Sequence, residues 1–210
     1  MQELTIFPIS IGIDTIPNFS DHKKKIVEFI KIKNFIQNNK SKELRHYHTT
    51  EKQLILDDSE LSYLKNFLET KANDYYQDVL GFKESLYISD SWINICKKGG
   101  YQPDHYHSNC VVSGTLYVQI GEGYSPITFR NPRTNSQPLT NEIKSLRSKD
   151  TIYNMDWVSL KNLQDGCVVF WPSYLVHGYE KNNFENRISI SFNLNIRRSD
   201  FLYASPFSET

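Results

Sequence analysis

The stretch Arg187–Ile196, written RISISFNLNI, alternates polar and apolar residues along its whole length and decides the fold class of the chain. Successive side chains of a β-strand point to opposite faces, so each set occupies a face of its own. The polar face carries Arg187, Ser189, Ser191 and Asn193. The apolar face carries Ile188, Ile190, Phe192 and Leu194. An exposed surface strand would show this pattern, and so would a strand that lines a pocket with its polar face while its apolar face packs under helices.

The same two-residue period begins near Leu86 and continues through most of the second half of the chain. The other segments with strand character are 86–96, 111–120, 126–130, 151–157, 166–171 and 174–180. Asp165-Gly166, at the start of one of them, is a tight-turn signal. Seven or eight short strands within about 110 residues are typical of an antiparallel sandwich or a jelly roll.

The first third of the chain has helical rather than strand-like spacing. In 19–39, apolar residues recur every three to four positions after Ser20 or Asp21, either of which can cap a helix. A second helix is expected over 57–81, with Gly81 at its end. Its apolar stripe is most simply a surface that packs against a sheet.

These patterns predict a single domain over residues 1–210 that is mainly β with N-terminal helices. We expect residues 1–85 to form a mostly helical support region, 86–198 the β core and 199–210 a tail. The polar segment 131–150 falls between predicted strands, and loops of this length are often lids or connectors. We expect it to move over the site.

Composition and charge exclude several classes of protein. Lys and Arg together number 24, as do Asp and Glu, so no net basic field exists to attract nucleic acid. No apolar run approaches the roughly 20 residues that a membrane helix needs. The stretch MQELTIFPIS lacks the basic and apolar segments of a signal peptide, so a cytoplasmic protein is expected. Cys96, Cys110 and Cys167 show no CxxC spacing and are expected to be reduced and buried.

The triplet His-Tyr-His occurs twice, at 46–48 and at 105–107, and uses four of the six histidines. Alternate residues of a strand point the same way, so His-x-His can present two ligands to one metal ion. The first triplet lies between the predicted helices with charged flanks, which favours a solvated connector or a short edge strand. The second follows Gly99-Gly100 and precedes a strand, and a further histidine, His177, lies in a later strand-like segment.

His105, His107 and His177 could cap one face of a metal ion and leave the opposite positions open to substrate. The alternative is that His105 and His107 only hydrogen-bond neighbouring loops, and spacing alone does not choose between the two. Arg187 favours the metal site, because a planar guanidinium can grip a carboxylate with two hydrogen bonds while the Ser189 hydroxyl lies alongside.

The order His-x-His, a distant histidine and Arg-x-Ser resembles the 2-oxoglutarate and Fe(II) dependent oxygenase superfamily. The similarity is closer to a group of small oxygenases of marine bacteria and their phages. The matching stretches are SWIN (91–94), GGYQPDHYHSN (99–109), SGTLYV (113–118), ITFRNPR (127–133), DGCVVFWPSYLVHGY (165–179) and RISISFN (187–193). They span nearly all of the C-terminal two thirds, whereas the N-terminal third matches only loosely.

The resemblance implies a double-stranded β-helix, the jelly-roll fold shared with cupins, in an oxygenase. It implies Fe(II) held by His105, His107 and His177, and 2-oxoglutarate held at its distal carboxylate by Arg187. Molecular oxygen and an unidentified substrate complete the set of partners, and 2-oxoglutarate would be converted to succinate. The protein would work in the cytoplasm of a bacterium or of a phage-infected host cell.

The middle ligand departs from the usual superfamily pattern, which places Asp or Glu two residues after the first histidine. His107 stands there, as it does in the closer group, and Asp104 would face away from His105 on a strand. Three neutral ligands leave Fe(II) with one more unit of net positive charge than two histidines and a carboxylate would. Redox potential and anion affinity should differ accordingly.

Two further residues of the expected pocket could bind the co-substrate. Asn94 shares a strand face with Trp92 and could hydrogen-bond 2-oxoglutarate, or it could bond only the backbone at the strand end. Tyr117 could place its hydroxyl near the carboxylate held by Arg187, or it could serve only as packing.

Two other functions stay open: a three-histidine, cupin-like dioxygenase or isomerase that does not use 2-oxoglutarate, and a non-catalytic jelly-roll binding module. Arg187 and Ser189 count against the first, and the three histidines count against the second. Arg130 and Arg133, at the start of the long loop, are expected to be solvated rather than to meet an anionic substrate. The substrate class stays open between protein, metabolite, nucleotide and lipid, and a homodimer stays open as the assembly.

Overall fold

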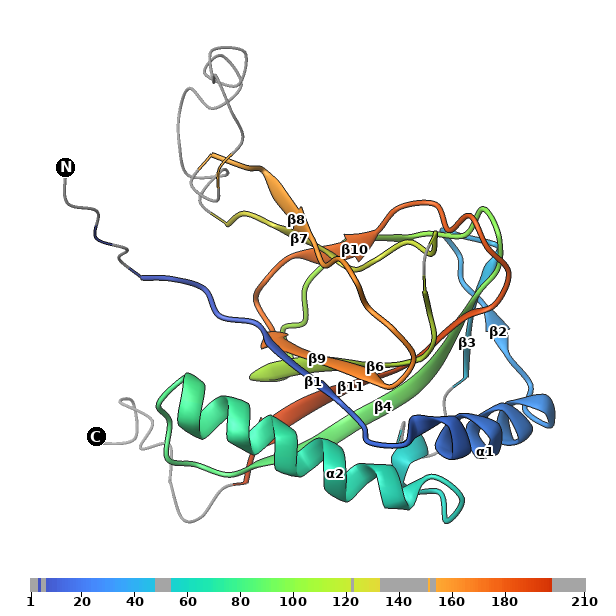
Figure 1. The fold of residues 1–210 in the computed structure, drawn as a ribbon, viewed down its shortest axis with the longest axis horizontal. Coiled ribbons are helices and arrows are strands. Elements are labelled where there is room, and N and C mark those ends of the chain that lie inside the picture. Colours follow the sequence, from blue (N-terminus) through green and yellow to red (C-terminus); the bar gives the residue numbers. More distant parts are fainter. Residues whose placement is uncertain are drawn as a thin grey trace, which may run out of the picture.

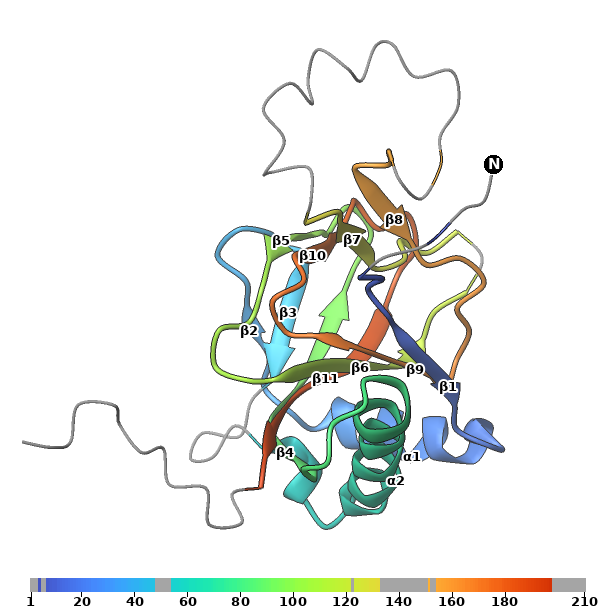
Figure 2. The same ribbon diagram turned by 90° about the vertical axis from the view of Figure 1, so that its left-hand side faces the viewer.

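Two antiparallel β-sheets face each other, with helices covering the outer face of the larger sheet (Figure 1, Figure 2). The computed structural model describes residues 4, 7–47, 54–121, 123–132, 151 and 154–197. The major sheet has the order β1-β9-β6-β11-β4-β3-β2 and the minor sheet the order β5-β10-β7-β8. The mainly β, double-stranded β-helix architecture expected from the alternating segments is confirmed.

The strands of the major sheet are β1 (Gly12–Thr15), β2 (Ile36–Gln37), β3 (Leu44–Tyr47), β4 (Leu86–Cys96), β6 (Val112–Gln119), β9 (Cys167–Pro172) and β11 (Arg187–Ile196). Those of the minor sheet are β5 (Gln102–His105), β7 (Thr128–Arg130), β8 (Trp157–Ser159) and β10 (His177–Tyr179). The helical elements are α1 (Phe19–Lys31), the short 3-10 turn η1 (Ile55–Asp57), α2 (Ser62–Asn73) and the π-helical turn η2 (Asp74–Val79).

Strand β11 is the centre of the major sheet, paired with β4 on one side and β6 on the other. Its apolar face, with Ile188, Ile190 and Phe192, joins the main hydrophobic cluster together with residues of α1 and α2. Its polar face lines the cavity between the two sheets. The structure therefore selects the pocket-lining interpretation of RISISFNLNI over the exposed surface strand.

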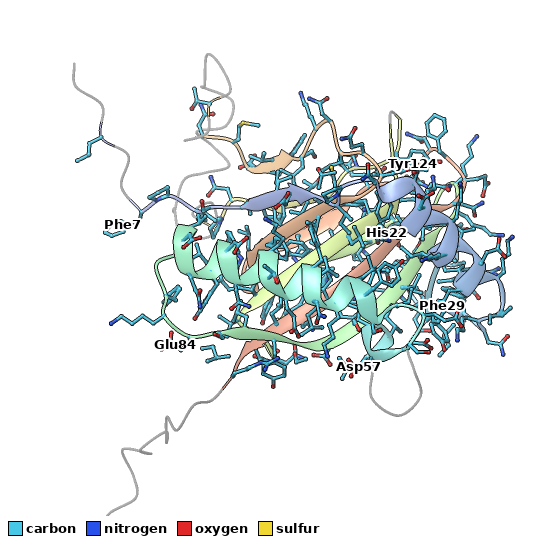
Figure 3. The ribbon with its side chains drawn as sticks, turned by 60° about the horizontal axis from the view of Figure 1, so that its bottom comes forward. Phe7, His22, Phe29, Asp57, Glu84 and Tyr124 are labelled. Carbon is cyan, nitrogen blue, oxygen red and sulfur yellow. The ribbon has the colours of Figure 1, made fainter. Side chains whose placement is uncertain are left out.

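The helices pack through the apolar stripes that the sequence shows. Phe29 of α1 is buried against the sheet, whereas Phe7 in the N-terminal segment is exposed (Figure 3). The stripe of α2 buries Leu64, Leu68 and Ala72 in the same cluster. Burying a Leu or Phe side chain contributes about 1.5–3 kcal/mol, so this layer is a major source of stability.

The prediction of a mostly helical N-terminal region missed three strands. Helix α1 begins at Phe19, after Asn18 in a left-handed conformation, so Ser20 and Asp21 lie in its first turn and do not cap it. It ends at Lys31, and Ile36–Gln37, expected to be helical, is strand β2. The strands β1, β2 and β3 are two to four residues long, too short for a periodic signal; long-range pairing holds β1 and β3 in the sheet, and β2 pairs with β3.

The remaining boundaries differ more modestly. Helix α2 begins at Ser62 instead of near residue 57, and Gly81 with φ 78° follows its π-helical extension as expected. The predicted strand 86–96 matches β4, and Gly166 with φ 84° makes the predicted turn before β9. The predicted strand 151–157 is wrong in position, since β8 begins only at Trp157. Most of the expected lid, and the tail from 198 onward, lie outside the described residues.

Two further expectations concern the state of the cysteines and the presence of membrane-spanning helices. All three cysteines are free, with Cys96 and Cys167 buried and Cys110 half-buried rather than fully buried. In the described part of the chain, no helix has the length and apolar character to cross a membrane.

Candidate metal centre

The structure brings His105, His107 and His177 together, with one ligand atom from each within 4.8 Å of the others. His105 ends β5 and pairs directly with His177, the first residue of β10. The expectation that His105 and His107 share one strand is wrong, because β5 ends at His105. His107 lies in the following loop, where its backbone N–H donates to the carbonyl of Ser173 at 3.0 Å.

A hydrogen bond at the Nδ1 atom fixes the orientation of each ring. His105 Nδ1 lies 2.9 Å from the carbonyl oxygen of Pro103, and His177 Nδ1 lies 2.9 Å from that of Leu175. His107 Nδ1 lies 2.6 Å from the side-chain oxygen of Asn193. These oxygens only accept, so each Nδ1 carries the hydrogen and the Nε2 lone pair is left for a metal ion.

Burial keeps two of these rings neutral. Desolvation, reinforced by the neighbouring His105, lowers the pKa of His177 to about 3. Desolvation also lowers the pKa of His107, against a smaller opposing effect of its bond to Asn193. Metal ligands must be deprotonated, so at neutral pH these imidazoles need lose no proton before binding.

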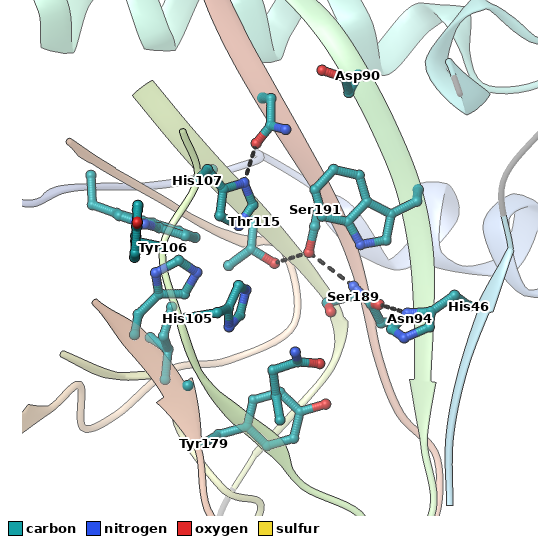
Figure 4. A pocket seen from close by; sticks show the side chains of 18 of the residues that line it. His46, Asp90, Asn94, His105, Tyr106, His107, Thr115, Tyr179, Ser189 and Ser191 are labelled. Carbon is teal, nitrogen blue, oxygen red and sulfur yellow. Dashed lines mark hydrogen bonds between the residues drawn. The ribbon is translucent and has the colours of Figure 1, made fainter. Parts of the chain in front are cut away.

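The three rings line a cavity of about 450 Å³ between the two sheets. In Figure 4, His105 and His107 lie across the cavity from Ser189 and Ser191 on β11. The cavity also takes side chains from β4 and β6, so its lining comes from both sheets. A cavity of this size is in the range of small-molecule sites, which span about 300–1,000 Å³.

Arg187 is a buried cation inside this cavity, with only 3% of its surface exposed. Its Nε donates to the Ser125 carbonyl at 3.0 Å, and its guanidinium carbon lies 4.0 Å from the ring centroid of Tyr179. No ion pair among the described residues includes Arg187, and Glu185, the acid nearest in sequence, is exposed. A buried charge without a counter-ion is costly, so the site calls for an anionic ligand.

Unsatisfied hydrogen-bonding groups surround the same end of the cavity. The hydroxyls of Tyr117 and Tyr179, whose rings lie next to the Arg187 guanidinium, are buried without a hydrogen-bond partner among the described residues. Burial raises the pKa of both phenols, so both hydroxyls stay protonated and can donate. Buried polar groups normally have a partner, and a bound anion would supply one to these donors beside Arg187.

The predicted co-substrate residues Asn94 and Ser189 lie opposite each other in the β4–β11 ladder and both line the cavity. Asn94 already uses its amide within the protein: Nδ2 donates to Ser191 Oγ at 2.9 Å, and its oxygen accepts from His46 Nδ1 at 2.5 Å. Asn94 therefore holds neighbouring side chains in place. Ser189 is 2% exposed and adjoins Tyr117 on the neighbouring strand.

The first triplet is not a solvated connector. His46 is half-buried on β3, inside the major sheet next to β4, and lines the edge of the cavity. Its Nε2 lies 2.9 Å from Asn38 Nδ2, and burial lowers its pKa. It is not part of the three-histidine group, and His48 lies outside the described residues.

Asp104 faces away from the three histidines, as strand alternation predicts. Its carboxylate accepts from Arg130 Nε at 2.6 Å, outside the cavity. The side chain of Arg130 is 40% exposed and does not line the cavity, which agrees with a solvated arginine that also forms a surface ion pair. Arg133 lies outside the described residues.

Sequence reasoning missed several lining residues, namely Asp90, Tyr106, Trp171, Tyr179 and Asn193. For Asn193 a signal was present, because it lies on the same face of the last strand as Arg187. For Tyr179 the signal was its position two residues after His177, which puts both side chains on one face of a strand.

The comparisons with known proteins agree with this geometry. Residues 90–193 match the family described as "Putative 2OG-Fe(II) oxygenase". The structure is similar to HygX from Streptomyces hygroscopicus, crystallised with nickel and 2-oxoglutarate, with a TM-score of 0.63 and 11% identity over 89% of this chain and 83% of that one. No curated protein sequence matches the chain.

Two further similar structures have the same fold. The α-ketoglutarate dependent epimerase SnoN from nogalamycin biosynthesis has a TM-score of 0.63 and 10% identity over 96% of this chain and 85% of that one. A prolyl-4-hydroxylase from Pseudomonas putida has a TM-score of 0.55 and 10% identity over 90% and 93%. The matched residues 90–193 include the three histidines and Arg187, and the match supports placing the chain in the 2-oxoglutarate and Fe(II) dependent oxygenase superfamily.

Proposed function

We propose that this protein is an oxygenase that couples decarboxylation of 2-oxoglutarate to oxidation of a second substrate. His105, His107 and His177 would hold Fe(II), and Arg187 would hold the distal carboxylate of 2-oxoglutarate. The observation that carries the proposal is the buried guanidinium of Arg187, which has no ion pair among the described residues and lies in the same cavity as three converging imidazoles.

The donor set fits a divalent iron with open positions. Three imidazole nitrogens on one side of an ion leave the opposite side free for a chelating co-substrate and for oxygen. The hydrogen bonds at Nδ1 of all three rings keep the rings in place and raise their basicity as ligands. The iron, when bound, would supply the oxidation of a C–H bond with release of succinate and carbon dioxide.

The Arg187 end fits a dicarboxylate. Its guanidinium can donate two parallel hydrogen bonds to a carboxylate, and Ser125 and Tyr179 hold it in place. The unpartnered hydroxyls of Tyr117 and Tyr179, together with Ser189, would complete the shell around that carboxylate. Buried in the cavity, these groups keep water away from the anion and hold it in one orientation.

The neutral third ligand affects how tightly the centre holds anions. With His107 in place of a carboxylate, the three ligands neutralise none of the charge of Fe(II), so the centre should attract anionic co-substrates more strongly. This property favours a 2-oxoglutarate dependent enzyme over a three-histidine dioxygenase that has no use for Arg187.

Anaerobic titration of the apoprotein tests the proposal directly. Fe(II) and 2-oxoglutarate added together should produce a visible charge-transfer band that neither produces alone. Exposure to oxygen should then convert 2-oxoglutarate to succinate, slowly in the absence of the second substrate. Binding of Fe(II) without any band on addition of 2-oxoglutarate would refute the proposal and favour a three-histidine enzyme of another class.

A further inference from the structure

The cavity has two chemically different ends. Along β11, Arg187 pairs opposite Cys96 and Asn193 opposite Asp90, so Arg187 and Asp90 are separated by six residue steps along the β4–β11 ladder. Six steps along a strand span roughly 20 Å at about 3.3 Å per residue. In Figure 4, Asp90 lies at the top of the view and Tyr179, which stacks on Arg187, at the bottom. One end of the cavity is therefore cationic and the other anionic.

Asp90 is the only acidic side chain among the described residues that line this cavity. It is half-buried, and the hydrogen bond found at its carboxylate comes from Ser89 Oγ at 3.0 Å. It takes part in no ion pair within the described ranges. A partly desolvated carboxylate in a cavity is stabilised by a cation, and no Lys or Arg side chain of the described residues pairs with this one.

An aromatic side chain lies at this end. Trp92 is on the same face of β4 as Asp90, and its ring stacks on that of His107 with centroids 5.9 Å apart. The face of a Trp ring attracts cations, so a positive group near Asp90 would meet both a carboxylate and an aromatic ring.

2-Oxoglutarate does not fill this end. If it spans from the histidines to Arg187, its five-carbon chain extends away from Asp90, and the Asp90 end is left for the second substrate. We propose that Asp90 and Trp92 form a subsite for a cationic, ammonium-bearing part of the substrate. The inference rests on the proposed function in one respect: it assigns the Arg187 end of the cavity to 2-oxoglutarate.

Matched probes test the charge preference without knowledge of the substrate. The probes are n-hexylammonium and 1-hexanol, which share a chain and differ in charge. The measurement is paramagnetic broadening of the probe proton signals by the Mn(II)-loaded protein, titrated to give a dissociation constant. The parent should bind the ammonium about tenfold more tightly than the alcohol, as expected for one charge-assisted contact.

Three variants decide whether Asp90 is the cause. Asp90→Asn should abolish the preference, and Asp90→Glu should retain it. Asp78→Asn, which removes an exposed acid from η2 on the helical side of the major sheet, should retain it too. Equal binding of both probes by the parent, or a preference that survives in Asp90→Asn, would overturn the inference. So would a loss of Mn(II) affinity in Asp90→Asn with the probe preference intact, because Asp90 would then serve the metal.

Calorimetry with 2-oxoglutarate on the same Mn(II)-loaded protein separates the two proposals. Binding of 2-oxoglutarate without an Asp90-dependent probe preference would leave the oxygenase proposal in place and overturn the subsite. An Asp90-dependent preference without any 2-oxoglutarate binding would support the subsite and overturn the oxygenase proposal.

Discussion

The two His-Tyr-His triplets have the same sequence, and each contains a histidine whose Nδ1 forms a hydrogen bond with an asparagine side-chain oxygen. His46 bonds Asn94 at 2.5 Å, and His107 bonds Asn193 at 2.6 Å. They differ at the other nitrogen. Nε2 of His46 accepts from Asn38, whereas Nε2 of His107 belongs to a group of three imidazoles. A histidine can bind a metal ion only through a free nitrogen lone pair. The partner of Nε2, and not the His-Tyr-His sequence itself, therefore distinguishes the structural histidine from the metal ligand.

The surroundings explain why only the second triplet has this arrangement. β5 pairs with β10, so His105 and His177 lie side by side, and the loop after β5 carries His107 to the same point. β3 pairs with β4 and β2, and the residues facing His46 across those pairings are Asn94 and Ile36. His46 is not part of the three-histidine group, and hydrogen bonds at both of its ring nitrogens hold the ring in the lining of the cavity.

Replacement of one histidine from each triplet should give the largest difference in metal affinity between two variants. His107→Ala should weaken Mn(II) or Fe(II) binding by more than about 100-fold, since even outer partners of a ligand contribute 10–100-fold. His46→Ala should change it by less than about threefold. Metal affinity measured by electron paramagnetic resonance of Mn(II) checks both. A loss in His46→Ala equal to that in His107→Ala would contradict the assignment of the ligands.

Arg187 lies in the same cavity as the second triplet, but its replacement should change the affinity for 2-oxoglutarate and leave the affinity for the metal unchanged. Arg187→Ala should weaken 2-oxoglutarate binding by about tenfold or more, since each charged hydrogen bond contributes about 1.5–3 kcal/mol. Arg187→Lys keeps the positive charge but cannot donate two parallel hydrogen bonds to a carboxylate, so the loss of 2-oxoglutarate affinity should be partial.

Calorimetry on Mn(II)-loaded proteins measures these affinities. Arg45→Ala, an exposed arginine on β3, is the control and should bind 2-oxoglutarate as the parent does. Metal affinity should stay the same in all three variants. An unchanged affinity for 2-oxoglutarate in Arg187→Ala would remove the carboxylate-binding role.

The two asparagines provide a matched pair with a smaller effect. Asn193→Ala removes the acceptor of His107 Nδ1 and should weaken metal binding by about tenfold, because the ring loses its fixed tautomer and orientation. Asn94→Ala removes the equivalent acceptor of His46 and should leave metal affinity near that of the parent. Mn(II) titration of both variants checks this, and an equal loss in the two would mean that the bonds act only through the fold.

The smallest expected effect concerns stability. His46→Ala leaves the oxygen of Asn94 and the amide of Asn38 without their partner, which should cost about 1–2 kcal/mol of unfolding free energy. Urea denaturation of the apoprotein measures it. A free energy of unfolding equal to that of the parent would show that water replaces the ring at no cost.

The sequence was most informative where local patterns and long-range structure agree. Strands β4 and β11 follow from two-residue alternation, and Arg187 with the three histidines follows from residue types in a chain order. Strands β1, β2 and β3 do not, because each is only two to four residues long; β1 and β3 are held by strands far away in sequence, and β2 pairs with β3. The role of Asp90 was hidden too, since one acid on a strand has no distinguishing pattern.

The central position of β11 in the major sheet affects when the sheet can be completed during synthesis of the chain. Arg187 and Asn193 lie on the last strand of the major sheet in chain order, and that strand fits between β4 and β6, which are synthesised long before it. Until it emerges from the ribosome, β4 and β6 have no shared neighbour and the anion site does not exist. Such long-range insertion is slow compared with local folding. The edges of β4 and β6 that face β11 therefore stay without this partner while residues 120–186 are synthesised, and the anion site is completed only when β11 is in place.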